Sequence, residues 1–143
     1  MSKLFTRLRA VVLAGVFTAG AMTAVAAPAS AFDGWACTVP SGHTYSKVER
    51  RVNTCGTGFM PYYYVRQPAN NLIACTLPSG FTYDLVDRSS DCSTSGLSPR
   101  YRLKTPAVGL WACTLPSGWT YTASQRTSDC STSGLGWQYR LAR

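Results

Sequence analysis

A period of 38 residues constrains this chain more than any other feature. The segment 35–42, WACTVPSG, recurs at 73–80 and at 111–118, an offset of 38 each time. Self-similarity at a fixed period indicates units that bury a core by packing against their neighbours. The same offset relates Thr44-Tyr45 to Thr82-Tyr83 and Thr120-Tyr121, Arg50 to Arg88 and Arg126, and Tyr63 to Tyr101 and Tyr139.

Each copy is predicted to hold three β-strands. The Cys-Thr-(Val/Leu) run is β-prone, and Pro-Ser-Gly after it predicts a hairpin through a type I turn with Pro second and Gly fourth. The return strand alternates, so Tyr83, Leu85 and Asp87 are expected on one face, opposite to Asp84, Val86 and Arg88. The third strand, 100–104, should point Tyr101 and Leu103 inward.

These elements predict an all-β fold of three tandem three-stranded β-meanders with one disulfide each, packed together. We expect the packing to use Trp35, Ile73, Trp111 and the repeated tyrosines. Pro68 and Pro106 mark connectors between the copies. The predicted organisation is 32–66 for repeat 1, 67–72 for the first connector, 73–104 for repeat 2, 105–110 for the second connector and 111–143 for repeat 3.

The first 31 residues have the pattern of a signal peptide. Lys3, Arg7 and Arg9 precede an apolar run over 10–27, and the small-x-small motif Ala29-Ser30-Ala31 follows. The alternative is a transmembrane anchor, but glycines and threonines interrupt the run. We therefore predict cleavage near 31 and a secreted, extracellular protein without a membrane span.

All six cysteines lie after the predicted cleavage point, which favours three disulfides in an oxidising compartment. The second cysteine of each copy follows the first by 18, 17 and 17 residues. Six cysteines allow about fifteen connectivities, and the repeat symmetry favours bridges within copies. The predicted pairs are Cys37–Cys55, Cys75–Cys92 and Cys113–Cys130, and each should contribute about 3 kcal/mol.

The residues of the chain argue against an enzyme. His43 is the only histidine, and the other copies carry Phe81 and Trp119 in its place, so no nucleophile–base pair recurs. The acidic residues form no repeated pair, and the cysteines are assigned to disulfides rather than to a metal. We expect no catalytic residue, no cofactor and no metal.

Arginine and tyrosine at outward positions are the candidate partner-binding residues. Nine of the eleven basic residues after position 31 are arginine, and the net charge there is +5. Arginine and tyrosine dominate interface hot spots. The predicted binding residues are Tyr62, Tyr64, Arg66, Arg100, Arg102 and Arg140. Alternatively, the charge is ordinary surface charge, and the tyrosines of repeat 1 cover a neighbouring repeat or the segment 32–34.

Two resemblances follow from these features. In size, export signal, disulfides and lack of catalytic groups, the chain resembles the small adaptor subunit of umbrella toxin particles secreted by filamentous actinobacteria. In its threefold repeat of about 40 residues it also resembles β-trefoil lectins. Their usual Gln-x-Trp motif is absent, and the only comparable position reads Trp137-Gln138-Tyr139. The first resemblance implies protein binding, and the second implies glycan binding.

The function expected from the sequence is that of a secreted non-catalytic binding protein. We interpret it as a protein–protein adaptor or recognition subunit of an extracellular complex of the toxin or antibacterial kind. One alternative is a glycan-binding module that stacks sugars on Trp119, Trp137 and the tyrosines. Another is a cationic antimicrobial or inhibitor protein. We expect no nucleic-acid partner.

Overall fold

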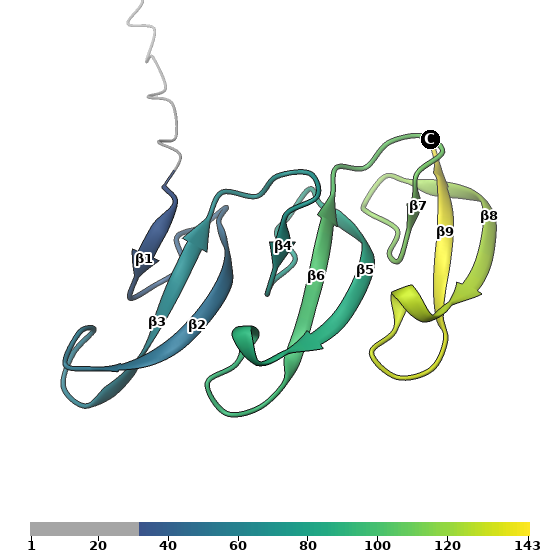
Figure 1. Ribbon diagram of the computed structural model, residues 1–143. Helices are drawn as coiled ribbons and strands as arrows, with labels where there is room; N and C mark the ends of the chain where they lie inside the picture. The colour runs from purple at the N-terminus through teal and green to yellow at the C-terminus, as the bar shows by residue number, and fades with distance from the viewer. Residues whose placement is uncertain (1–31) are drawn as a thin grey trace, which may run out of the picture.

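Three small antiparallel sheets, one for each repeat, lie in a row (Figure 1). The computed structural model describes residues 32–143, so the predicted signal peptide lies outside the described residues. The all-β class with one three-stranded sheet and one disulfide per repeat is confirmed. The elements are β1 (Gly34–Ala36), β2 (Thr44–Val52) and β3 (Phe59–Arg66) in repeat 1; β4 (Ile73–Ala74), β5 (Thr82–Ser89), the 3₁₀ turn η1 (Ser90–Cys92) and β6 (Ser98–Lys104) in repeat 2; and β7 (Trp111–Ala112), β8 (Thr120–Thr127), η2 (Ser128–Cys130) and β9 (Gly136–Ala142) in repeat 3.

The strand order within each sheet differs from the predicted meander. The order is β1-β3-β2, β4-β6-β5 and β7-β9-β8, so the last strand of each repeat is central. The expected hairpin between the first two strands is therefore wrong, because the Pro-Ser-Gly turn joins the two edge strands instead. The first strand, only two or three residues long, pairs with the central one.

The Pro-Ser-Gly turn also differs from its prediction. In repeat 2 the N–H of Phe81 donates to the carbonyl of Pro78 at 3.3 Å, which places the proline first and the glycine third. Gly80 has φ +83°, a conformation that favours glycine and is typical of the third position of a type II turn. The predicted turn therefore began one residue too early in the sequence.

A β-bulge interrupts the second strand of every repeat. In repeat 2 the register passes from Tyr83↔Leu103 to Leu85↔Arg102, which leaves Asp84 as the extra residue. The predicted alternation is consequently wrong for Tyr83 and Asp84, the two residues before the shift. Tyr83 contacts Tyr101 and lies on the face opposite to Asp87. Asp84 and Asp87 both reach the face that carries the arginines of β6, as their ion pairs show below.

The three disulfides join the pairs that the repeat symmetry favours, Cys37–Cys55, Cys75–Cys92 and Cys113–Cys130. In repeats 2 and 3 the second cysteine ends a 3₁₀ turn, which a side chain caps. The amide of Asp91 donates to Ser89 Oγ at 3.1 Å. Disulfides of this kind form in oxidising, extracellular environments.

Neighbouring repeats meet through a small hydrogen-bonded joint. At the joint between repeats 1 and 2, the N–H of Cys75 donates to the carbonyl of Tyr45 at 2.7 Å. The hydroxyl of Thr44, which is fully buried, donates to the carbonyl of Thr76 at 3.1 Å and lies 2.7 Å from its hydroxyl. We call the surface around Thr44 and Tyr45 the trailing face of a repeat, and the surface around Cys75 and Thr76 the leading face of the next.

The core is thin and lies largely at these joints. Its members come mainly from the central strand, from the short first strand and from the disulfides: Val48, Val65, Ala74, Cys75, Val86, Cys92, Leu103, Ala112, Cys113 and Leu141. The predicted packing through Trp35 and Ile73 is wrong. Ile73 is 37% exposed, and Trp35 stacks on a tyrosine of its own repeat. The fully buried Ala74 lies instead next to the joint, where the N–H of the following Cys75 donates to Tyr45.

Candidate partner-binding surface

The outer face of repeat 1 carries a cluster of aromatic side chains from two neighbouring strands. Strand β1 supplies Trp35, which lies opposite Tyr64 of the central strand β3. Side chains alternate along a strand, so Tyr62 and Tyr64 point to the same face. The three rings are half-buried. We call Trp35, Tyr62 and Tyr64, with the arginines described next, the aromatic patch.

The rings of the patch hold one another in place. Trp35 stacks on Tyr62 with a centroid distance of 5.1 Å and an interplanar angle of 15°. Trp35 also meets Tyr64 edge to face, at 5.4 Å and 65°. Such pairs contribute about 0.5–1.5 kcal/mol beyond their buried area. The patch is therefore ordered before any partner arrives.

Two guanidinium groups flank the rings. The guanidinium carbon of Arg51 lies 5.7 Å from the centroid of Tyr62, and that of Arg66 lies 5.8 Å from the centroid of Tyr64. These distances allow cation–π attraction. Arg66 Nε also donates to Asp33 Oδ2 at 2.9 Å. The patch thus combines aromatic surface with two arginines.

Asp33 ties the edge of the patch to the chain that leaves β3. Its second oxygen accepts from the backbone N–H of Gln67 at 3.1 Å. This backbone hydrogen bond, together with the bond and charge of Arg66, lowers the pKa of Asp33 below its ordinary value, although partial burial opposes the change. Asp33 stays ionised and keeps Arg66 beside Tyr64.

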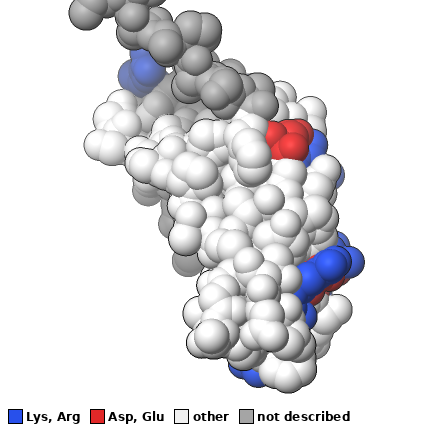
Figure 2. Space-filling view, turned by 90° about the vertical axis from the view of Figure 1, so that its left-hand side faces the viewer, with Lys and Arg blue, Asp and Glu red and all other residues white. Residues whose placement is uncertain are grey.

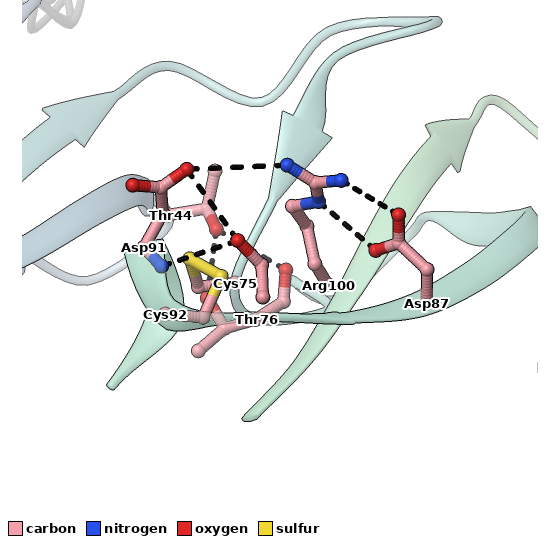
Figure 3. The surroundings of a disulfide bond; sticks show 8 residues. Thr44, Cys75, Thr76, Asp87, Asp91, Cys92 and Arg100 are labelled. Carbon is pink, nitrogen blue, oxygen red and sulfur yellow. Dashed lines mark hydrogen bonds and ion pairs between the residues drawn. A yellow bond between two sulfur atoms is a disulfide. The ribbon is translucent and has the colours of Figure 1, made fainter. Parts of the chain in front are cut away.

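The equivalent face of repeat 2 is occupied by ion pairs. Arg100 binds Asp87 through two hydrogen bonds of 2.9 and 2.6 Å, as Figure 3 shows. Arg102 binds Asp84 in the same way at 2.7 and 3.1 Å. The bonds from Arg100 lower the pKa of Asp87 and raise that of Arg100. The predicted binding residues Arg100 and Arg102 therefore bind carboxylates of their own repeat.

In repeat 3 a pair of amide side chains replaces the first of these ion pairs. Gln138 accepts from Gln125 Nε2 at 2.8 Å, which replaces the ion pair by an amide pair. The last predicted binding residue, Arg140, lies opposite Trp111 in the sheet and is exposed. Within 32–143 no carboxylate pairs with it. The three outer faces are thus aromatic, ionic and amide in turn.

Of the predicted binding residues, the structure brings together only Tyr62, Tyr64 and Arg66. Trp35 and Arg51 belong to the same patch and were missed. Trp35 was missed because the predicted hairpin paired the first strand with the second, whereas β1 pairs with β3 and so brings Trp35 beside Tyr64. Arg51 lies opposite Met60 in the register of β2 and β3, on the face of Glu49 and Tyr62.

A separate groove lies between the Pro-Ser-Gly turns of repeats 2 and 3. It encloses about 660 Å³ and is lined by Phe81, Trp119 and Arg143, among others. The guanidinium carbon of Arg143 lies 4.7 Å from the ring centroid of Trp119. This volume is in the range of small-ligand sites.

Neither metal-binding clusters nor candidate membrane helices occur in the part of the chain that the structure describes. No three His, Cys, Asp or Glu side chains of 32–143 gather as a metal site would require. No helix in these residues is long and apolar enough to cross a membrane. The ring of His43 lies beside its own turn, with Nδ1 3.3 Å from the carbonyl of Ser41.

The comparisons with known proteins identify no relative. No protein-family model, no curated protein and no solved structure matches the chain. The resemblances to the adaptor subunit of umbrella toxin particles and to β-trefoil lectins stay predictions from the sequence, and the function must be argued from the surface itself.

Proposed function

We propose that this chain is a secreted, non-catalytic recognition protein that binds a protein partner through the aromatic patch of repeat 1. The observation that carries the proposal is the stack of Trp35 on Tyr62 beside Arg51, at the surface of a disulfide-bonded sheet. The hot spots of protein–protein interfaces are enriched in tryptophan, tyrosine and arginine.

Preorganisation supports protein binding by this face. The rings contact each other and two guanidinium groups, so few rotamers are lost when a partner covers them. Each immobilised flexible side chain otherwise costs about 0.5–1.5 kcal/mol on association. A partner that offers an apolar surface with acidic groups at its rim would meet both the rings and the arginines.

Divergence between the repeats favours a protein over a sugar as the partner. A lectin that used its repeats equivalently would keep the same groups at the same positions. Here the positions of Tyr62 and Tyr64 hold Arg100 and Arg102 in repeat 2, both bound to aspartates. The candidate binding chemistry is concentrated in one copy.

The test is capture of a partner from the culture medium of the producing cells. Immobilised oxidised chain should retain a protein, and Tyr62→Ala with Tyr64→Ala should weaken binding by about 2 kcal/mol or more, some thirtyfold. The matched control is Trp137→Ala, which removes an exposed ring from repeat 3. Equal loss in the control and the double variant, or loss only through unfolding, would contradict the proposal.

Glycan binding is the second candidate, and the groove between repeats 2 and 3 is the observation that favours it. A sugar ring would stack on Phe81 or Trp119 within its 660 Å³. A glycan array distinguishes the candidates. Sugar binding that Trp119→Ala removes and Tyr62→Ala leaves unchanged would assign the function to the groove.

A further inference from the structure

The two ends of the row display the two halves of the joint that links repeats inside the chain. Thr38 and Cys37 of repeat 1 are equivalent to Thr76 and Cys75, and both are exposed. Thr120 and Tyr121 of repeat 3 are likewise exposed. Within 32–143 these four residues have no hydrogen-bond partner in another repeat. Each end therefore keeps the groups of a joint without its counterpart.

The joint is a transferable unit because it occurs twice with the same geometry. The bond from Cys113 N–H to the carbonyl of Tyr83 measures 2.7 Å, as does the bond from Cys75 to Tyr45. The hydroxyl of Thr82 lies 2.9 Å from that of Thr114 and donates to its carbonyl at 3.1 Å. The outer faces of the joined repeats differ, yet the joint is unchanged.

We propose that the trailing face of repeat 3 binds the leading face of repeat 1 of a second copy of this chain. In this contact the hydroxyl of Thr120 meets Thr38, and the N–H of Cys37 donates to the carbonyl of Tyr121. The partner is thus a second copy, and the contact continues the interface that already joins the repeats. The inference does not depend on the proposed function.

The surfaces at both ends suit this contact. Figure 2 views the molecule from the end of repeat 1, and most of the described surface there carries no charge. At the opposite end, β8 is an edge strand of its sheet, so its outer backbone groups are open to pairing.

Two differences limit the strength of the contact. In repeats 2 and 3 the 3₁₀ turns η1 and η2 contact the second strand of the preceding repeat, whereas repeat 1 has no such turn between β2 and β3. Val48 and Val86 are buried on the trailing faces of repeats 1 and 2, whereas Ser124 takes their place in repeat 3 and is exposed. A polar outer face is typical of the terminal unit of a repeat protein. Inside the chain, the connectors also hold the repeats at an effective concentration of about 1 mM or above. Association between copies is therefore reversible.

The geometry of the row makes the assembly open rather than closed. Copies related in the way that successive repeats are related form a head-to-tail contact, in which different surfaces of the two molecules meet. The three repeats in Figure 1 lie side by side without turning back on themselves. The expected products are short linear oligomers that grow with concentration.

The first measurement is sedimentation velocity of the oxidised chain, as an exporting host releases it, from about 10 µM to about 1 mM. The average mass should rise with concentration. Ser124→Val restores the buried valine and should shift this rise to about tenfold lower concentration. Thr132→Lys, a substitution at an exposed loop position, is the control and should change nothing. A constant monomer mass for wild type and Ser124→Val would overturn the proposal.

The second measurement establishes which surfaces meet. Thr120→Lys blocks the trailing face and Thr38→Lys blocks the leading face, and both residues are exposed, so the folds are kept. Each variant alone should remain monomeric, and an equimolar mixture should form dimers that grow no further. Dimers of either variant alone would show a different contact and overturn the proposal. The aromatic patch is unaltered, so partner capture tests the proposed function separately.

Discussion

The outer face of β3 in repeat 1 and that of β6 in repeat 2 occupy equivalent places in nearly the same backbone. On the first, Trp35, Tyr62 and Tyr64 form a ring cluster. On the second, Arg100 and Arg102 each bind an aspartate bidentately. Arginines on both faces bind carboxylates of their own repeat, including Arg51 with Glu49 and Arg66 with Asp33 in repeat 1. Of the two, only the face of repeat 1 also keeps apolar ring area at the surface.

The comparison shows that the outer face of a repeat can change while the joint between repeats stays the same. The joint uses Thr44 and the backbone of Tyr45 and Cys75, none of which lies in the aromatic patch. An outer face can therefore change from ionic to aromatic without disturbing the packing of its neighbours. Nearest-neighbour packing of this kind is the property that makes repeat proteins tolerant of surface change.

The disulfides should give the largest contrast between the repeats. Replacing Cys37 and Cys55 by Ala should lower the free energy of unfolding by about 3 kcal/mol, from loop closure. Replacing Cys75 and Cys92, which are only 8% and 5% exposed, should cost about 1 kcal/mol more, because a cavity opens at the joint. Urea unfolding measures both. Equal losses would show that the joint does not depend on the buried bridge.

Threonines of the trailing faces should show the next largest contrast. Thr44→Val keeps the shape of the side chain but removes the hydroxyl that donates to the carbonyl of Thr76, a part-buried hydrogen bond whose loss should cost about 0.5–1.5 kcal/mol. Thr120→Val, at the exposed equivalent position, should change stability by less than about 0.5 kcal/mol. Thermal unfolding of the two variants, compared at concentrations where the chain is monomeric, checks this. A similar loss in both would contradict the assigned joint.

The ion pairs of repeat 2 should contribute less. Asp87→Asn removes the carboxylate that Arg100 binds, but both side chains are partly exposed, at 43% and 32%. Solvent screening limits the expected loss to about 1 kcal/mol or less. Glu49→Gln, at the equivalent position of repeat 1, should cost still less because Arg51 remains over the rings. Urea midpoints at low and high salt measure both effects, and salt should reduce the effect of Asp87→Asn.

Acid should reduce the difference in stability between wild type and Asp87→Asn. The pKa of Asp87 is lowered from 3.8, chiefly because Arg100 donates hydrogen bonds to it. A carboxylate whose pKa is lower in the folded state stabilises the fold above its unfolded pKa, and this contribution is lost as pH falls through the folded pKa. The difference between the melting temperatures of the two proteins should be largest near about pH 7 and should shrink as pH falls below the ordinary pKa of 3.8. A difference that does not change with pH would assign the effect to packing.

Much of the fold was predictable because the same pattern of strands and cysteines occurs in three copies of the repeat. The period placed the cysteines so that symmetry selected one set of pairs, and the β-prone runs marked the strands. Strand order was not predictable from alternation, since alternation says which face a residue occupies and not which strand lies beside it. The bulge at Asp84 was missed because Leu85 makes the alternation that starts at Tyr83 look regular. The shifted pattern is carried by Val86, which shares a face with Tyr83 although it lies three residues after it.

The candidate site was predicted in part. Tyr62, Tyr64 and Arg66 were expected on the outer face, and the structure places them in the aromatic patch with Trp35 and Arg51. The ion pairs of Arg100 and Arg102 could not be foreseen, since one of their partners reaches this face only through the bulge. Whether the patch binds a partner stays a prediction.

The connectivity of the disulfides bears on how the chain acquires its shape during synthesis. Each bridge joins consecutive cysteines, so Cys37 can pair with Cys55 before Cys75 has been synthesised. Oxidation in the order of appearance then yields the native pairs one after another, without a search among alternative pairings. We expect such a chain to mature without help from a disulfide isomerase, whereas refolding the whole reduced chain exposes all six thiols at once and invites scrambling.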